Sequence, residues 1–173
     1  MAFLTTWNMT DLPSEMIDIL EEDIKKFDNW QDKSKVMGDD EIAPKIRNSK
    51  NAWIPTEHWI GGWIWYYIQK ANRENFLYDL YDIDGGNIQY THYYPGDYYT
   101  WHIDGDISTT FKPEIKPGTG ENLRDDQTFH KGECVRKLSF SLQLSDAKDY
   151  RGGEVEFINS AGEIYVAPKQ KGT

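Results

Sequence analysis

The stretch QYTHYYPGDYYTWHID, residues 89–104, is the part of the sequence from which fold and chemistry are most readily inferred. Its aromatic and β-branched residues favour two strands, Ile88–Tyr94 and Tyr98–Ile103, joined by a short turn. Residues i and i+2 of a strand face the same side, so His102 and Asp104 present an imidazole and a carboxylate next to each other. These are two of the three ligands of the 2-His-1-carboxylate triad found in non-haem Fe(II) oxygenases.

Two helices are expected before this stretch. The first runs from Leu12 to Phe27, where apolar residues including Met16 recur at helical spacing and Asp11 or Ser14 can cap the start. The second begins at Thr56 and ends near Ala71. Its two glycines lower helix propensity, which predicts close packing against a sheet. Three tryptophans of this region are expected to belong to the core: Trp59, Trp63 and Trp65.

Short strands dominate the rest of the chain. The predicted strands are Leu77–Ile83, Ile88–Tyr94, Tyr98–Ile103, Arg136–Leu144, Glu154–Asn159 and Glu163–Ala167, with one more near residues 42–46. Turn sequences stand at Asp84–Asn87 and Ser160–Gly162. Helices followed by short strands predict an α+β fold, mainly β, with a barrel or jelly-roll core.

The chain of 173 residues has the size of one domain. Residues 1–75 are expected to form a helical support and residues 76–173 the strands, with the polar segment 105–133 as a long loop over the site. A net charge of −10 argues against nucleic acid as a partner. The single cysteine, Cys134, excludes an intramolecular disulfide framework. No signal peptide or membrane span is recognised, which predicts a soluble, cytoplasmic protein without a membrane partner.

The wider pattern carries a family resemblance. Tyr93, Gly96-Asp97, Tyr99 and His102-x-Asp104 stand at fixed offsets, and two later motifs, Arg136-Lys137-Leu138-Ser139 and Arg151-Gly152-Gly153-Glu154, each lead into a strand. This string resembles the prolyl-4-hydroxylase-like branch of the Fe(II)/2-oxoglutarate-dependent dioxygenases. The resemblance extends from about Pro13 to the last residue and is specific from Gln89 to Phe157.

The resemblance implies a double-stranded β-helix with N-terminal helices packed on one sheet. It also implies decarboxylation of 2-oxoglutarate to succinate and CO2, coupled to hydroxylation of a C–H bond in a peptidyl proline, a related side chain or a small molecule. His102 and Asp104 match the first two iron ligands, while Tyr93 and Tyr99 match positions that line the 2-oxoglutarate pocket. Fe(II), 2-oxoglutarate and ascorbate are the implied cofactors. Trp101 is expected to point to the opposite face and join the core.

The family pattern continues beyond a Lys-Gly-Thr such as Lys171-Gly172-Thr173, with strands that carry a distal histidine and a basic residue for 2-oxoglutarate. No residue of this sequence matches these two, so we expect a C-terminally incomplete oxygenase domain. The other histidines, His58, His92 and His130, are interpreted as structural or exposed, and Arg136, Lys137 and Arg151 as solvated charges. The alternative is a non-catalytic jelly-roll binding or scaffold module, either degenerate or completed by a partner chain.

Overall fold

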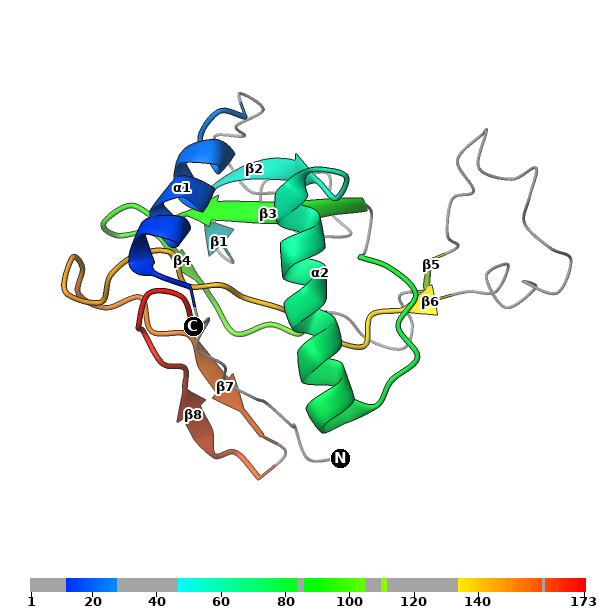
Figure 1. Cartoon of the computed structure of the whole chain (residues 1–173). Helices are drawn as coiled ribbons and strands as arrows, with labels where there is room; N and C mark the ends of the chain where they lie inside the picture. The colour runs from blue at the N-terminus through cyan, green and yellow to red at the C-terminus, as the bar shows by residue number, and fades with distance from the viewer. Residues whose placement is uncertain (1–11, 28–46, 84–85, 105–109, 112–133, 160) are drawn as a thin grey trace, which may run out of the picture.

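A computed structural model of the chain describes residues 12–27, 47–83, 86–104, 110–111, 134–159 and 161–173 (Figure 1). In chain order its elements are α1 (Ser14–Ile24), β1 (Arg47–Asn48), β2 (Lys50–Pro55), α2 (Trp59–Ala71), the π-helical turn η1 (Asn72–Phe76), β3 (Asn87–His92), β4 (Tyr98–Tyr99), β5 (Thr110–Phe111), β6 (Cys134–Val135), β7 (Glu156–Ile158) and β8 (Ile164–Val166).

α1 is an amphipathic helix with one buried face. Ile17, Leu20 and Ile24 are spaced three and four residues apart, so they share the side turned to the core and are almost fully buried. The predicted helix over 12–27 is therefore confirmed within narrower bounds. Met16 was expected on the buried face, but its side chain is 42% exposed. The Ser14 side chain makes no capping hydrogen bond, because α1 begins directly after Pro13.

α2 begins at Trp59, three residues after the predicted start, because Thr56 is held at the end of β2. The Thr56 amide and hydroxyl both donate to the carbonyl of Gly86, at 3.0 and 3.1 Å. Gly61 of α2 packs on this fixed residue so closely that a Cβ atom would lie 2.0 Å from the Thr56 carbonyl oxygen. The expected close approach exists, but its partner is the backbone of one residue rather than a sheet.

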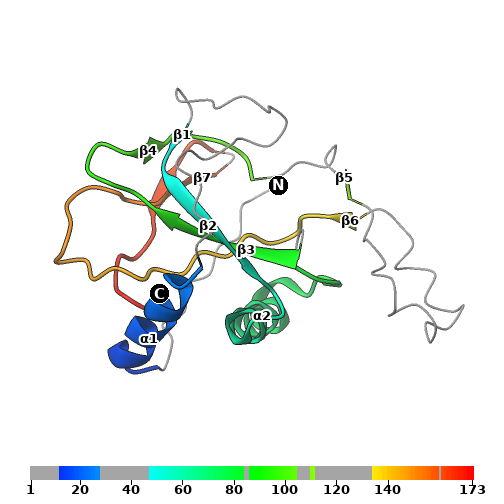
Figure 2. The ribbon, with the colours of Figure 1, turned by 90° about the horizontal axis from the view of Figure 1, so that it is seen from above.

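β2 and β3 form the longest antiparallel pair, in a register from Lys50 opposite His92 to Pro55 opposite Asn87. Both helices lie on one side of this pair (Figure 2). Alternation along the two strands divides their residues between two faces. Ala52, Ile54 and Tyr90 are buried on the face turned to the helices. The sequence predicted β3 but not β2.

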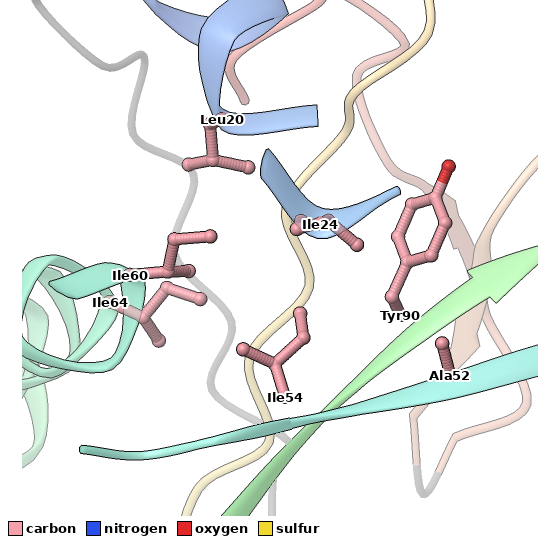
Figure 3. Close-up of a cluster of buried hydrophobic side chains, with 7 residues drawn as sticks. All are labelled: Leu20, Ile24, Ala52, Ile54, Ile60, Ile64 and Tyr90. Carbon is pink, nitrogen blue, oxygen red and sulfur yellow. The ribbon is translucent and has the colours of Figure 1, made fainter. Parts of the chain in front are cut away.

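The core joins side chains from four elements, which point toward one another in Figure 3. The cluster consists of Leu20 and Ile24 from α1, Ala52 and Ile54 from β2, Ile60 and Ile64 from α2, and Tyr90 from β3. Trp63 packs against its edge. Trp59, predicted to be part of the core, is 46% exposed, because its indole instead donates to Asp23 of α1 at 2.6 Å.

Three predicted strands differ from the structure. No strand forms at 77–83, because both backbone polar groups of Tyr78 bond to the side chain of Asn72 instead of a neighbouring strand. Residues 136–144 also form no strand; Gln143 instead exchanges backbone hydrogen bonds with Gly172 and Thr173 at the end of the chain. The strand expected at 98–103 ends at Tyr99. The one expected near residues 42–46 lies outside the described residues.

The last two predicted strands are confirmed as a short hairpin, β7–β8, in which Phe157 lies opposite Tyr165. Its turn depends on Asn159, whose side-chain oxygen accepts from the amides of Ala161 and Glu163, both at 2.9 Å. Gly162 follows with a φ of +82°, a conformation that favours glycine.

The described residues thus form a mixed fold with two α-helices and four separate antiparallel strand pairs. The predicted combination of N-terminal helices with antiparallel strands is confirmed. These pairs do not close into a barrel, so the jelly roll stays a prediction, as does the extent of the domain. None of the described helices has the length and apolar character needed to cross a membrane.

Candidate functional site

His102 and Asp104 lie in an irregular segment that directly follows β4, and their side chains meet. The His102 Nδ1 atom is 2.7 Å from the carbonyl oxygen of Thr100, and its Nε2 atom is 3.0 Å from Asp104 Oδ1. The Thr100 carbonyl thus accepts from a ring two residues ahead, directly after the end of β4 at Tyr99. Both side chains are partly accessible, His102 to 32% and Asp104 to 48%.

The distance between Nε2 and Oδ1 suits two neighbouring ligands of one metal ion. Nitrogen and oxygen ligands bind small divalent cations at about 2.1 Å, and two such ligands at right angles lie roughly 3 Å apart. The Thr100 carbonyl can only accept, so Nδ1 donates to it, while Nε2 lies at hydrogen-bond distance from the Asp104 carboxylate; a bound metal would take the place of that second contact. The two donors thus fit one edge of a coordination sphere. Nowhere in the described part of the chain, this site included, do three His, Cys, Asp or Glu side chains form a group that could hold a metal.

The Tyr99 ring packs against the His102 ring. The two rings are stacked, with centroids 3.6 Å apart and planes at 15°. Burial raises the pKa of the Tyr99 phenol, Arg47 opposes that shift, and Asp104 and Tyr93 add to it. Tyr93 itself is 45% exposed. The structure therefore brings three of the four residues predicted for the site into contact, because the His102 ring meets both Asp104 and Tyr99.

Arg47 is a member of this neighbourhood that was not predicted from the sequence. Its guanidinium carbon lies 4.7 Å from the centroid of the Tyr99 ring, and only 7% of the residue is exposed. No strand was expected at residues 47–48, and no role was assigned to Arg47. The alternation of Arg47, Ser49 and Asn51 is the available signal, because polar residues two apart share one face of a strand.

Two further residues near the site differ from expectation. Arg136 is exposed, as predicted for a solvated charge, but its Nη1 atom donates to the backbone carbonyl of Asp104 at 2.7 Å. It therefore helps to position the segment that carries the carboxylate. Trp101 was predicted to join the core and is 55% exposed, because the chain has left the strand before reaching it.

The other described histidines lie elsewhere. His92, the last residue of β3, borders an open pocket with Lys25, Lys50, Tyr90 and Tyr94, and its ring centroid lies 4.5 Å from that of Tyr94. This agrees with its interpretation as a packing residue. His58 precedes α2 and packs edge-to-face on Phe27, 5.2 Å between centroids. His130 and almost all of the segment 105–133 lie outside the described residues.

We compared the chain with protein-family models, with curated proteins and with solved structures, and none of the three searches gave a significant match.

Proposed function

We propose that this protein is an Fe(II)- and 2-oxoglutarate-dependent dioxygenase that hydroxylates a C–H bond. The observation that carries the proposal is the pairing of His102 Nε2 with Asp104 Oδ1 at 3.0 Å, which matches the bite of two ligands on one ion. The resemblance of residues 89–157 to the prolyl-4-hydroxylase-like dioxygenases supplies the reaction. Peptidyl proline, or a related side chain, is the corresponding substrate class.

Each residue of the neighbourhood has a role in this proposal. His102 and Asp104 hold the metal. Tyr93 and Tyr99 supply hydroxyl groups and ring faces that bind and orient 2-oxoglutarate beside it. Arg136 keeps the carboxylate-bearing segment in place through the Asp104 carbonyl. When bound, Fe(II) and 2-oxoglutarate supply the oxidising chemistry, and succinate and CO2 are released.

Electrostatics favour an acidic co-substrate here although the chain is acidic overall. Arg47 lies 4.7 Å from the centroid of the Tyr99 ring and Arg136 donates to the Asp104 carbonyl, so two cations lie next to residues of the site. Asp104 would be neutralised by the metal. The local balance of charge thus becomes positive once the metal is bound, and this attracts 2-oxoglutarate.

A second candidate function is a non-catalytic binding module. It is favoured by the small number of metal donors: among the described residues, no third His, Cys, Asp or Glu side chain joins His102 and Asp104. This alternative predicts neither tight metal binding nor turnover.

The test is anaerobic titration of the metal-free protein with Fe(II), followed by 2-oxoglutarate, ascorbate and oxygen, with succinate measured by mass spectrometry. For an oxygenase domain that includes the distal histidine and the basic residue implied by the resemblance, the proposal predicts one bound Fe(II) and formation of succinate. His102→Gln and Asp104→Asn should each weaken Fe(II) binding at least tenfold and abolish succinate formation. His92→Gln is the matched control, because His92 borders the pocket lined by Lys25 and Tyr90 rather than the His102–Asp104 pair, and it should leave both quantities unchanged.

Two results would overturn the dioxygenase assignment. One is the absence of succinate in the presence of bound Fe(II) and 2-oxoglutarate, which supports the binding module. The other is metal binding that is equally strong in His102→Gln, Asp104→Asn and the parent protein, since the metal would then bind elsewhere.

A further inference from the structure

Arg47 is a buried cation whose hydrogen-bond partners are all neutral. Its Nε atom donates to Ser49 Oγ at 2.8 Å. Its Nη2 atom lies 3.1 Å from three acceptors, the side-chain oxygens of Asn51, Gln89 and Thr91. None of these acceptors carries a charge, and no ion pair to Arg47 occurs within the described residues. Burying a guanidinium without a carboxylate is costly, and here the cost is offset by hydrogen bonds to four neutral side chains that hold the group in place.

The partners fix the guanidinium in one place. Ser49 and Asn51 are each 1% exposed, and Asn51 lies directly opposite Thr91 in the β2–β3 register. By strand alternation, Asn51, Gln89 and Thr91 occupy the face of this pair that is turned away from the helices. A planar fork held from several sides by a rigid strand pair has little freedom to move.

The guanidinium in turn contacts Tyr99, and Tyr99 contacts His102. The cation lies 4.7 Å from the centroid of the phenol ring, within the range of a cation–π interaction. The imidazole is stacked on the same ring at 3.6 Å. A continuous series of contacts therefore leads from the β2–β3 pair, through Arg47 and Tyr99, to the imidazole.

His102 needs such support because its own backbone provides little. β4 ends at Tyr99, and the next residues form no strand. Trp101 and Ile103, on either side of His102, are 55% and 76% exposed and anchor nothing in the core. Among the described residues, the ring is held by its bond to Thr100, its contact with Asp104 and its stacking on Tyr99.

We infer that Arg47 is a positioning residue: it fixes the Tyr99 ring, and through that ring it holds the His102 imidazole with Nε2 directed toward Asp104. The chemical meaning of this role rests on the proposed function, since the orientation matters for binding a metal. The positional claim itself concerns only the metal-free protein. It can be tested without metal or turnover.

The test uses the NMR signals of the His102 ring carbons and protons, assigned by their loss in His102→Gln. In the parent protein, stacking on Tyr99 shifts these signals upfield by the ring current. Tyr99→Leu should abolish that shift, whereas Tyr99→Phe, which retains the ring, should preserve it. Arg47→Lys should reduce the shift, because a lysine lacks the planar fork that its acceptors fit. The signals of His58 and His92, measured in the same spectra, should not move.

A second variant covers the case in which Arg47→Lys does not fold. Thr91→Val removes one acceptor of Arg47 and keeps the shape of the side chain, so it should reduce the His102 shift in the same direction by a smaller amount. If the His102 shift stays at the parent value in every folded variant of Arg47 and Thr91, while Tyr99→Leu abolishes it, the inference is overturned. Tyr99 would then hold the imidazole without Arg47.

A second measurement, Co(II) binding, tests whether the orientation of His102 affects the affinity for a metal. Arg47→Lys should weaken Co(II) binding about tenfold, the usual effect of losing a residue that orients a metal ligand. The two experiments separate the inference from the proposed function. A His102 shift that depends on Arg47 in a protein that binds no metal leaves the positioning role standing and removes the dioxygenase. Normal Co(II) binding together with an unchanged His102 shift in the Arg47 and Thr91 variants removes the positioning role alone.

Discussion

Tyr90 places a titratable hydroxyl at the boundary between the core and α1. Its ring belongs to the buried cluster, and its hydroxyl lies 3.4 Å from a carboxylate oxygen of Glu21. Burial and the negative charge of Glu21 raise the pKa of Tyr90 to about 12. The ordinary value is 10.0, so this phenol resists ionisation in the folded protein.

Stability should therefore fall at alkaline pH through Tyr90. Between pH 10 and 12 the unfolded chain loses the phenolic proton first and the folded protein keeps it, so the stabilisation present below pH 10 is lost as pH rises. Tyr90→Phe removes this contribution. We expect the difference in unfolding free energy between parent and variant to be constant below pH 9 and to fall by about 1 kcal/mol at pH 11.

Urea unfolding of both proteins at pH 8, 9, 10 and 11 measures this difference, and the comparison cancels the titration of lysines and the other tyrosines. A difference that does not change with pH would show that the hydroxyl is not shielded by the core.

At the scale of elements, the start of α2 depends on a contact between two backbones. Thr56 is fixed by its two hydrogen bonds to Gly86, and Gly61 lies against the Thr56 carbonyl. A side chain at 61 would have to displace either the helix or the end of β2. The neighbouring Gly62 has no atom within 4 Å of the place where a Cβ would stand. Close packing therefore requires a glycine at position 61 but not at position 62.

The substitutions Gly61→Ala and Gly62→Ala should have opposite effects. Gly61→Ala creates a clash with backbone atoms, and we expect a loss of roughly 1–3 kcal/mol, as for other overpacked sites. Gly62→Ala adds helix propensity at an open position and should stabilise by about 0.5–1 kcal/mol. Urea midpoints give both values. Shifts of equal sign would mean that α2 adjusts freely at Thr56.

The elements that could be predicted are those in which the sequence pattern and the local hydrogen bonding agree. α1 has its apolar residues at helical spacing, and β7–β8 has a turn closed by the Asn159 side chain. β2 was missed because its buried polar residues, such as Asn51, pair with a strand far along the chain, β3. The strand expected at 77–83 does not form because the Asn72 side chain bonds to both the amide and the carbonyl of Tyr78. The spacing of apolar residues does not predict such a side-chain bond.

The candidate site also combines contacts that a local sequence pattern predicts with contacts that depend on long-range strand pairing. His102 and Asp104 are two residues apart, so a local rule sufficed to predict that they meet. The contact of Arg47 with Tyr99 joins residues far apart in the sequence and depends on how β1 and β4 pair, Arg47 opposite Tyr99. That pairing is a tertiary property, and the sequence alone therefore assigned Arg47 no role.

At the scale of the whole molecule, the described part contains two regions of unequal burial. α1, α2, β2 and β3 share one core. The β7–β8 hairpin lies apart from α2 (Figure 1), and its β-branched residues Ile158, Ile164 and Val166 are 45%, 55% and 53% exposed. It is joined to the remainder near the end of the chain, where Gln143 bonds to Thr173 and Lys171 pairs with Asp18. A hairpin with so little buried surface should open without unfolding the core.

Native-state hydrogen exchange tests this difference in stability. Hydrogen-bonded amides of β2 and β3 should exchange only through global unfolding, with a free energy of opening that falls steeply with urea. Amides of Glu156–Ile158 and Ile164–Val166 should exchange through local opening, with a smaller free energy that hardly depends on urea. Leu20→Ala is the discriminating variant, because Leu20 is 2% exposed and belongs to the core. It should lower the opening free energy of the β2–β3 amides by about 2–5 kcal/mol and leave the hairpin amides unchanged. Equal losses in both regions would mean that the hairpin and the core unfold as one unit, and that the exposed hairpin face is stabilised by contacts beyond the described residues.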